Sequence, residues 1–514
     1  MKEILNKVRS TRIIGLSTNW FHVFLIVVIV LGILLRCINI DSRVYWDDEV
    51  ITSIRVAGYQ IANIVQVLLN KSTASASDLM IYQLPSSAMS FSDTVQGLIA
   101  EEPQHPPIYF LLARLWIQLF KNFGSSVVVI RSFSVFISLI TFPCLYWLCL
   151  ELFRSRYVGF IAMAIMAVSP FHLFYAHAAR PYTLWFLAIT LSSTLLLRSL
   201  RLNTSLSWIA YSVSVILALY ICFISVFVFI SHGIYIVLMQ GKRLTKATVL
   251  YLITMAVSSL AFLPWLLATN SNLRALNTTT GWSSEKLGSL NLLRLSLNNL
   301  REVFFSIGQG YAYLTFLLLI CIVFSFYFLW RKVPKSVWVF IFSLVGVTVI
   351  ALLVPDLLRG GERRSTASRY FIAPYLGINL SLSYLFCIQG SVVVGWLRNF
   401  WQAIAAFLLT LGAVSCINLN QSEVSFHPDF SNIKVPAQTI NKYERPLIVT
   451  NLDIKNITSS NNVIGSIGFS YLLKPDTQFQ FIANNSQIDF SEPSKTVFVY
   501  VEGSTIFLKS ESAK

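Results

Sequence analysis

The stretch "WFHVFLIVVIVLGILLRCINIDSRVYWDDEV", Trp20 to Val50, decides the fold class. It begins with an apolar run of about 20 residues, the length that an α-helix needs to cross the hydrocarbon core of a bilayer. It ends with the adjacent acids Asp47, Asp48 and Glu49, at the point where the chain leaves the apolar run. The stretch therefore indicates a membrane protein with negative charge concentrated at one membrane surface.

The composition of the whole chain agrees with a membrane-spanning protein. Of 514 residues, 55% are hydrophobic and 12% are charged, and the mean hydropathy is +0.66. A soluble protein carries roughly a quarter charged residues. We attribute the net charge of +16 to basic cytoplasmic loops, so we predict no nucleic-acid partner. The cysteines lie in or beside apolar segments, which favours buried thiols over a disulfide framework or a metal site.

Further apolar segments follow, separated by the polar stretches 41–105 and 269–308. We expect about eleven spanning helices, near residues 20–40, 126–150, 157–175, 182–200, 207–221, 222–240, 247–268, 311–330, 336–355, 370–388 and 399–418. The predicted fold is an all-α polytopic membrane protein with a small α/β or β domain at its C-terminus. In the alternating segments "PLIVTNLDI" and "KTVFVYVEG" of the tail, we predict β-strands.

The predicted domain boundaries follow the same composition. Residues 1–420 form a transmembrane catalytic domain, within which residues 41–125 form a first extracytoplasmic loop with interfacial helices. Residues 421–514 form an extracytoplasmic C-terminal domain, whose sequence contains no motif that suggests chemistry.

The run "PPIYFLLARLWIQLF", Pro106 to Phe120, sets the predicted topology. It is short for a span, and Arg114 and Gln118 recur on one helical face, which is typical of a helix lying in the membrane interface. If it does not span, four basic connections share one side with the basic N-terminus, as the positive-inside rule requires. We therefore predict a multi-pass protein of the inner (plasma) membrane, with a cytoplasmic N-terminus and with the active site and C-terminal domain outside.

The outward acids allow two interpretations. Three acids in the first turn of a helix interact favourably with the helix dipole, and an apolar stripe that begins at Val50 and Ile54 predicts such a helix. The functional alternative is a general base. A carboxylate in a partly desolvated cleft has a raised pKa and can accept a proton from a hydroxyl group.

Arginines on the same predicted side favour the functional interpretation. The segment "LLRGGERRSTASRY", Leu357 to Tyr370, and the segment "AHAARPY" place guanidinium groups outside, against the usual charge bias. Contact with lipid headgroups would account for them, but guanidinium groups also bind phosphate in bidentate fashion. The predicted phosphate and donor site consists of Arg180, Arg369, Arg363, Arg364, Tyr182, Tyr370 and His105, and the predicted acceptor or lining residues are Asp47 and His177.

Acids, arginines and access from the lipid combine into one mechanism. A sugar on a polyprenyl phosphate carries a leaving group that is already an anion, so no acid need protonate it. The enzyme must deprotonate an acceptor hydroxyl and stabilise the departing phosphate. With one base opposite the leaving group, direct displacement inverts the anomeric centre.

The ordered motifs "WDDE", "HPPIYFLLARLW", "SPFHLFYAHAARPYTLWFL" and "SRYFIAPYLG" resemble the GT-C glycosyltransferases of the protein O-mannosyltransferase and aminoarabinose-transferase type, over roughly residues 20–420. The resemblance implies a GT-C fold whose first outer loop carries a catalytic Asp–Glu pair, which maps onto Asp48 and Glu49. In this type the segment that reads "YAHAARPY" here usually reads like "YSQEARPY". The present segment keeps Arg180 and Tyr182 but has His177 at the Gln position and no acid at the Glu position.

The resemblance also bears on cofactors and acceptors. Some relatives hold a divalent metal near the donor phosphate, which makes Glu101, Glu102 and His105 conceivable ligands, although we expect no required cofactor. The acceptor can be a glycan, a lipid or a protein. A transporter or flippase for an anionic lipid-linked substrate would also use outward arginines, and an assembly protein could act through its tail. Neither alternative requires the acid cluster.

Overall fold

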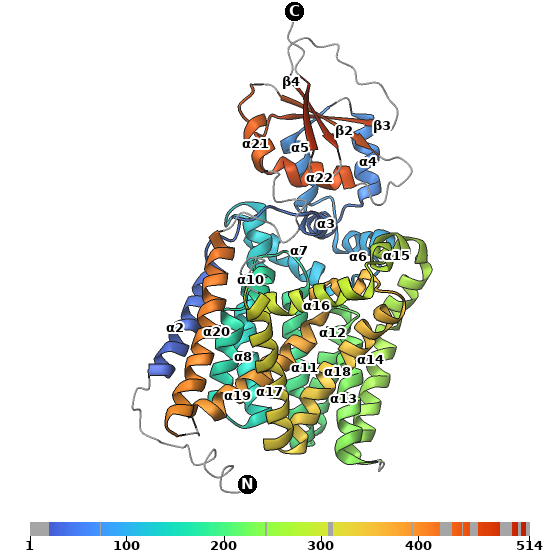
Figure 1. Ribbon diagram of the computed structural model, residues 1–514. Coiled ribbons are helices and arrows are strands. Elements are labelled where there is room, and N and C mark those ends of the chain that lie inside the picture. The colour runs from blue at the N-terminus through green and yellow to red at the C-terminus, as the bar shows by residue number, and fades with distance from the viewer. Residues whose placement is uncertain are drawn as a thin grey trace, which may run out of the picture.

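Long helices form a bundle, and a small α/β domain covers one end of it (Figure 1). The computed structural model describes residues 20–71, 73–241, 244–306, 312–391, 394–421, 434–444, 446–452, 461–483, 496–501 and 505–509. The basic segment that precedes Trp20 lies outside the described residues, as do Lys242 and Arg243.

Within the described residues, eight helices are long and apolar enough to cross a membrane. They are α2 (Trp20–Cys37), α8 (Ser126–Phe153), α11 (Tyr182–Leu202), α14 (Lys246–Ser271), α17 (Ala312–Lys332), α18 (Lys335–Leu358), α19 (Ile372–Ser391) and α20 (Trp396–Gln421). A ninth span forms if α9 (Arg156–Ala167) and α10 (Pro170–Ala176), which meet at 68°, count as one broken helix. Proline restricts the residue before it, so Ser169–Pro170 is a natural break.

Two further predicted spans are helices of marginal length. α12 (Ser205–Ile221) has 17 residues and α13 (Ser225–Gln240) has 16. Each of the eleven predicted segments therefore contains an apolar helix or the bent pair, and the predicted fold class of a polytopic helical membrane protein is confirmed.

Short helices lie at the end of the bundle that faces the α/β domain (Figure 1). α7 (Ile108–Phe120) has 13 residues, too few to cross a bilayer, in agreement with the predicted interfacial helix. The other short elements at this end are α3 (Asp47–Ala57), α6 (Phe91–Glu101), α15 (Leu273–Thr280), η2 (Gly281–Ser284), α16 (Ser289–Phe304), η3 (Arg363–Thr366) and η4 (Ser368–Phe371). α4 (Ile61–Asn70) and α5 (Ala76–Met80) lie beside the sheet of the α/β domain (Figure 1), and η1 (Ile81–Gln83) follows α5.

The C-terminal domain contains a five-stranded sheet with the order β1-β3-β2-β4-β5. β3, β2 and β4 are parallel to one another, while β1 and β5 pair antiparallel at the edges. The elements are β1 (Ala74–Ser75), β2 (Pro446–Leu452), β3 (Gln478–Ala483), β4 (Thr496–Val501), β5 (Thr505–Lys509), α21 (Lys434–Ile440) and α22 (Asn461–Ser470). The two strands predicted from alternation are β2 and β4, so the predicted small α/β domain is confirmed.

One edge strand of this sheet comes from the first outer loop. Ala74 of β1 pairs with Phe479 of β3, and the Ala76 amide donates to the Thr477 carbonyl at 2.8 Å. Loop residues are thus built into the domain that the sequence assigned to residues 421–514.

The same domain rests directly on α3. A Cβ atom at Gly468 of α22 would lie 3.1 Å from Cγ2 of Val50 and 3.3 Å from the Tyr45 carbonyl oxygen. The rings of Tyr471 and Tyr45 meet edge to face at 5.1 Å. The C-terminal domain therefore supports the helix that carries the three acids.

Candidate active site

Asp48 and Arg180, far apart in the sequence, lie together. Asp48 is in the first turn of α3, and its Oδ2 is 3.5 Å from Nη2 of Arg180. Nη1 of Arg180 donates to the Asp48 carbonyl and to Oγ1 of Thr52, each at 2.9 Å. The Asp48 side chain is 28% exposed while that of Arg180 is 3% exposed, so the carboxylate is the accessible member of the pair.

The charge of Arg180 is secured by its surroundings. Burial alone would lower the pKa of the guanidinium, but the nearby Asp48 carboxylate, Tyr182 and Glu102 outweigh it and raise the pKa above its ordinary value. A permanently charged, nearly buried guanidinium beside an accessible carboxylate is suited to hold an anion next to a base.

Glu49, the immediate neighbour of Asp48, faces another partner. Arg131 of α8 donates through Nη2 to Oε2 at 2.7 Å and through Nε to Oε1 at 2.9 Å, and both side chains are 1% exposed. Oε1 of Glu49 also accepts the Ala179 amide at 2.7 Å. Both oxygens of Glu49 are therefore occupied, and the residue fixes the backbone next to Arg180.

Arg369 also contacts Tyr182. Its guanidinium carbon lies 5.7 Å from the ring centre of Tyr182, 5.6 Å from that of Trp282 and 5.5 Å from that of Tyr370. The guanidinium carbon of Arg180 is also 5.7 Å from the Tyr182 ring centre. Tyr182 thus makes cation–π contacts with two guanidinium groups.

His105 joins this cluster as a neutral imidazole. Nη2 of Arg180 lies 3.4 Å from its Nε2, and since a guanidinium only donates, that nitrogen accepts. Burial, reinforced by the charge of Arg180 and opposed by Asp48, lowers the pKa of His105 to about 3. Glu102 is next in the chain of contacts, with Oε1 3.9 Å from the same nitrogen.

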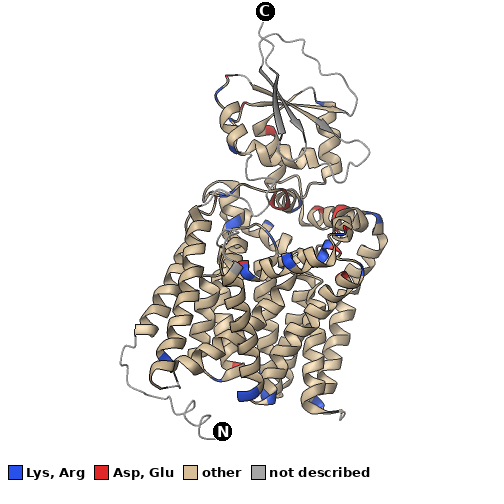
Figure 2. Ribbon diagram, viewed as in Figure 1, with Lys and Arg blue, Asp and Glu red and all other residues tan. Residues whose placement is uncertain are grey.

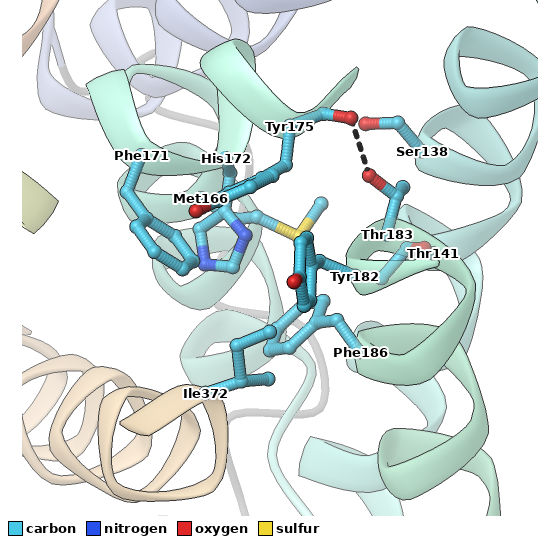
Figure 3. A pocket seen from close by; sticks show the side chains of 10 residues that line it. All are labelled: Ser138, Thr141, Met166, Phe171, His172, Tyr175, Tyr182, Thr183, Phe186 and Ile372. Carbon is cyan, nitrogen blue, oxygen red and sulfur yellow. Dashed lines mark hydrogen bonds between the residues drawn. The ribbon is translucent and has the colours of Figure 1, made fainter. Parts of the chain in front are cut away.

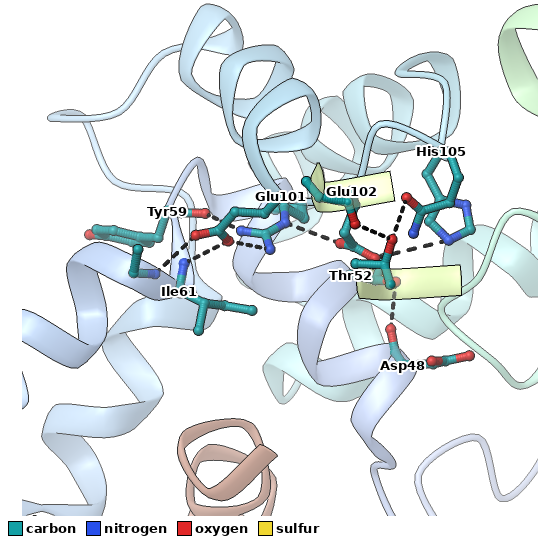
Figure 4. Close-up of polar contacts among 12 residues, drawn as sticks. Asp48, Thr52, Tyr59, Ile61, Glu101, Glu102 and His105 are labelled. Atoms are coloured by element: carbon teal, nitrogen blue, oxygen red, sulfur yellow. Dashed lines mark hydrogen bonds and ion pairs between the residues drawn. The ribbon is translucent and has the colours of Figure 1, made fainter. Parts of the chain in front are cut away.

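Glu101 and Glu102, which are labelled in Figure 4, both form ion pairs with Arg55 of α3. Nη2 of Arg55 is 2.5 Å from Oε2 of Glu101, and its Nε is 3.1 Å from Oε2 of Glu102. Glu101 also accepts the amides of Ile61 and Ala62 at the start of α4, each at 2.9 Å.

This arrangement does not suit a metal ion at Glu101. Both of its oxygens are engaged by amide hydrogens, and the Arg55 guanidinium adds a positive charge where a cation would have to bind. In the part of the chain that the structure describes, no group of three or more histidine, cysteine, aspartate or glutamate side chains is arranged as a metal site.

A small cavity lies on the bundle side of Tyr182, between α8, α10 and α11 (Figure 3). Aromatic and aliphatic side chains make most of its wall, and Thr183 is fixed there by a 2.7 Å bond from Oγ1 to the Tyr175 carbonyl. Tyr182 therefore separates the charged cluster from an apolar space within the bundle.

Three predicted site residues face other partners. His177 is buried, and its Nε2 lies 2.9 Å from the carbonyl oxygen of Arg36, away from the Asp48 carboxylate. Arg363 pairs with the exposed Glu285 at 2.7 Å, and Arg364 pairs with the buried Asp356 at 2.6 Å. These two arginines have carboxylates of their own and build the connection between α18 and α19.

Asp47 remains beside the cluster, partly buried in the same first turn as Asp48.

Two contributors were missed in the sequence. Arg131 lies within an apolar span, and a charged residue in such a segment is itself a signal of function or of a buried partner. Trp282 lies in the polar 269–308 segment, where a single aromatic residue carries no pattern; only the fold brings it over Arg369.

The sequence model of the dolichyl-phosphate-mannose-protein mannosyltransferase family matches residues 104–267. This match confirms the family resemblance over that segment. The segment begins next to His105 and contains Arg180 and Tyr182, and it supports glycosyltransferase activity. No curated protein matches the chain.

The chain is also similar, at low sequence identity, to solved structures of two proteins. AglB, an archaeal oligosaccharyltransferase from Archaeoglobus fulgidus solved with an inhibitory peptide and a dolichol-phosphate, is 13% identical, with 89% of this chain and 65% of that chain covered and a TM-score of 0.47. ArnT from Cupriavidus metallidurans is 12% identical, both with undecaprenyl phosphate (91% and 87% covered, TM-score 0.49) and in the apo state (91% and 86%, TM-score 0.47). The chain thus spans less than two thirds of the length of AglB.

Proposed function

We propose that the protein transfers a sugar from a polyprenyl-phosphate-linked donor to a hydroxyl acceptor on the extracytoplasmic side of the membrane, with inversion at the anomeric carbon. The observation that carries the proposal is the 3.5 Å approach of an accessible carboxylate, Asp48, to a nearly buried guanidinium, Arg180. The match to a family named for dolichyl-phosphate-mannose supports a lipid-linked donor.

In the proposed reaction, Asp48 accepts the proton of the acceptor hydroxyl. The acceptor oxygen forms a bond to the anomeric carbon while the bond from that carbon to the phosphate oxygen breaks, and the electron pair remains on the phosphate. General-base catalysis of this kind contributes about 10²–10⁴-fold to the rate. Attack from the face opposite the leaving group inverts the configuration.

The phosphate is proposed to bind between Arg180 and Arg369, next to the Tyr182 ring that both guanidinium groups contact. Two fixed positive charges stabilise the negative charge that develops on the leaving group, without any rearrangement during the reaction. Glu49 has no free oxygen for this chemistry, so we assign it the role of a positioning residue that holds the backbone before Arg180. No step requires a metal ion.

Charge distribution supports the proposed sidedness. Lysine and arginine gather at the end of the bundle opposite the C-terminal domain, while residues of both signs lie beneath that domain (Figure 2). Under the positive-inside rule, the first end faces the cytoplasm and the site faces outward.

The test is the substitution Asp48→Asn in the full-length protein, assayed with a polyprenyl-phosphate sugar. We expect turnover to fall by about 10²–10⁴-fold while the donor still binds, because the arginines remain. Asp41→Asn, which neutralises an exposed acid in the same outer segment, should leave turnover unchanged.

A transporter or flippase would give the opposite result in the same assay. Lipid movement across the membrane would persist in Asp48→Asn, and no transferred sugar would be found with the wild-type protein.

A further inference from the structure

A separate groove opens near the C-terminal end of α3, past the buried Arg55 cluster. Residues from the turn that follows α3 and from α4, η1 and α6 line a space of about 390 Å³, and Gly58, the C-cap residue of α3, is part of its wall. The φ of Gly58 is +93°, and a Cβ atom there would lie 3.1 Å from Cβ of Met89. A glycine is therefore required for the chain to turn at this wall.

The lining combines aromatic rings with neutral hydrogen-bonding groups. The rings of Tyr59 and Tyr82 meet edge to face at 5.3 Å. Asn63 and Gln96, both exposed, contribute amides that donate and accept, and Asp93 contributes a carboxylate. Hydrogen bonds from the Ser90 backbone and side chain lower the pKa of Asp93, so it is an acceptor at neutral pH.

Positive charge is missing from this lining, in contrast to the catalytic cluster. None of the residues that line the groove in the described part of the chain is a lysine or arginine. Arg114 lies behind the wall, fully buried, and donates to the Val56 carbonyl at 2.8 Å. A phosphate or other anion would meet only Asp93, so the donor headgroup is excluded on charge.

We propose that this groove binds a neutral, hydroxyl-rich part of the acceptor, that is, a glycan chain. Sugar hydroxyls both donate and accept hydrogen bonds, and the amide side chains can do the same in return. The apolar C–H faces of a sugar pack on tyrosine rings whose hydroxyl groups remain in contact with water. The inference rests on the proposed function, since it names the acceptor class for the same site.

The groove lies at a useful distance from the base. Asp48 lies in the first turn of α3 and Gly58 follows its end, so at about 1.5 Å of rise per residue the two are about 15 Å apart. That separation suits an oligosaccharide, with one end in the groove and a terminal hydroxyl at Asp48. A single sugar would not reach both places.

A peptide acceptor fits the groove less well. Extended peptides commonly bind by adding a strand to an exposed sheet edge, and the lining belongs to helices and their connections. The glycan is therefore the occupant that these residues favour.

The experiment uses the full-length protein in lipid nanodiscs on an array of neutral oligosaccharides of graded length, with phosphorylated glycans and short peptides on the same surface. We expect binding of neutral glycans above a minimal length. The double variant Asn63→Ala/Gln96→Ala should weaken that binding by about ten-fold, because two hydrogen bonds are lost. Gln66→Ala is the matched control on α4, exposed but outside the groove, and should bind like wild type.

Three results would overturn the proposal: binding of no neutral glycan, equal weakening by Gln66→Ala, or binding of peptides or phosphorylated glycans instead.

The variant Asp48→Asn separates the groove proposal from the proposed function. If that variant loses turnover and no glycan binds the wild type, the groove proposal fails while the transferase proposal stands. If glycans bind and Asp48→Asn keeps full turnover, the assignment of Asp48 as the base fails while the groove proposal stands.

Discussion

Asp48 and Glu49 are neighbours in the sequence, yet the fold gives them different environments. Asp48 faces an accessible site next to Arg180, while Glu49 is enclosed with Arg131. A sequence can show that both acids lie at one membrane surface. It cannot show which one turns inward, because that depends on Arg131, which lies 82 residues after Glu49 in the chain.

The Glu49–Arg131 pair makes a prediction for stability. Glu49→Gln keeps the shape but leaves the Arg131 charge buried without its partner, which costs about 3–5 kcal/mol. Glu285→Gln is the matched control, since it breaks the exposed pair with Arg363, worth about 0–1 kcal/mol. Denaturant titration in detergent measures both, and equal losses of unfolding free energy would contradict the structural role of Glu49.

His105 makes a prediction for pH dependence. Its native pKa is about 3, against an ordinary value of 6.5, so between these values the unfolded chain binds a proton that the native protein does not. Stability is therefore full above pH 6.5 and falls as the pH is lowered toward 3. Thermal melts of His105→Gln should show a shallower decline below pH 6.5 and the same behaviour as wild type above it.

The same residue constrains the rate profile. Because His105 is neutral through the working range, its removal should not abolish an inflection of kcat near pH 6.5. An inflection there that disappears in His105→Gln would show that the histidine titrates in the native site, contrary to its contact with Arg180.

At the scale of elements, the sequence predicted the positions of the apolar helices well, since length and hydropathy determine spans. The sequence did not predict the contact between α22 and α3. No distinctive pattern surrounds Gly468, which allows the contact because it has no side chain where α22 meets Val50. Likewise β1 has two residues, too few for alternation to reveal a strand.

Gly468→Val tests whether α22 supports the catalytic helix. The added methyl groups would clash with Val50 and push α22 away, and such overpacking costs about 1–3 kcal/mol. We expect a lower melting temperature together with slower turnover, because α3 carries Asp48. Asn461→Val, at the exposed start of the same helix, should change neither. Slower turnover without any loss of stability would point to a different cause.

At the scale of the whole molecule, the predicted topology brought Asp48 and the Arg180 segment to one side before any contact was known, and the structure places them in contact. Arg363 and Arg364 show the limit of that reasoning. The predicted side of the membrane does not determine which carboxylate an arginine pairs with. Arg363 pairs with Glu285 and Arg364 with Asp356, so neither joins the site at Arg180.

Sidedness itself can be tested by labelling. Ser126 at the start of α8 bonds Tyr471 of the C-terminal domain, and the 28 residues of α8 place its other end about 40 Å away, just before α9. With the wild-type cysteines as background, Ser77→Cys on α5 should react with a membrane-impermeant maleimide in intact cells. Arg156→Cys at the start of α9 should react only after permeabilisation. The reverse pattern would place Asp48 in the cytoplasm and remove the basis for an outward-facing transferase.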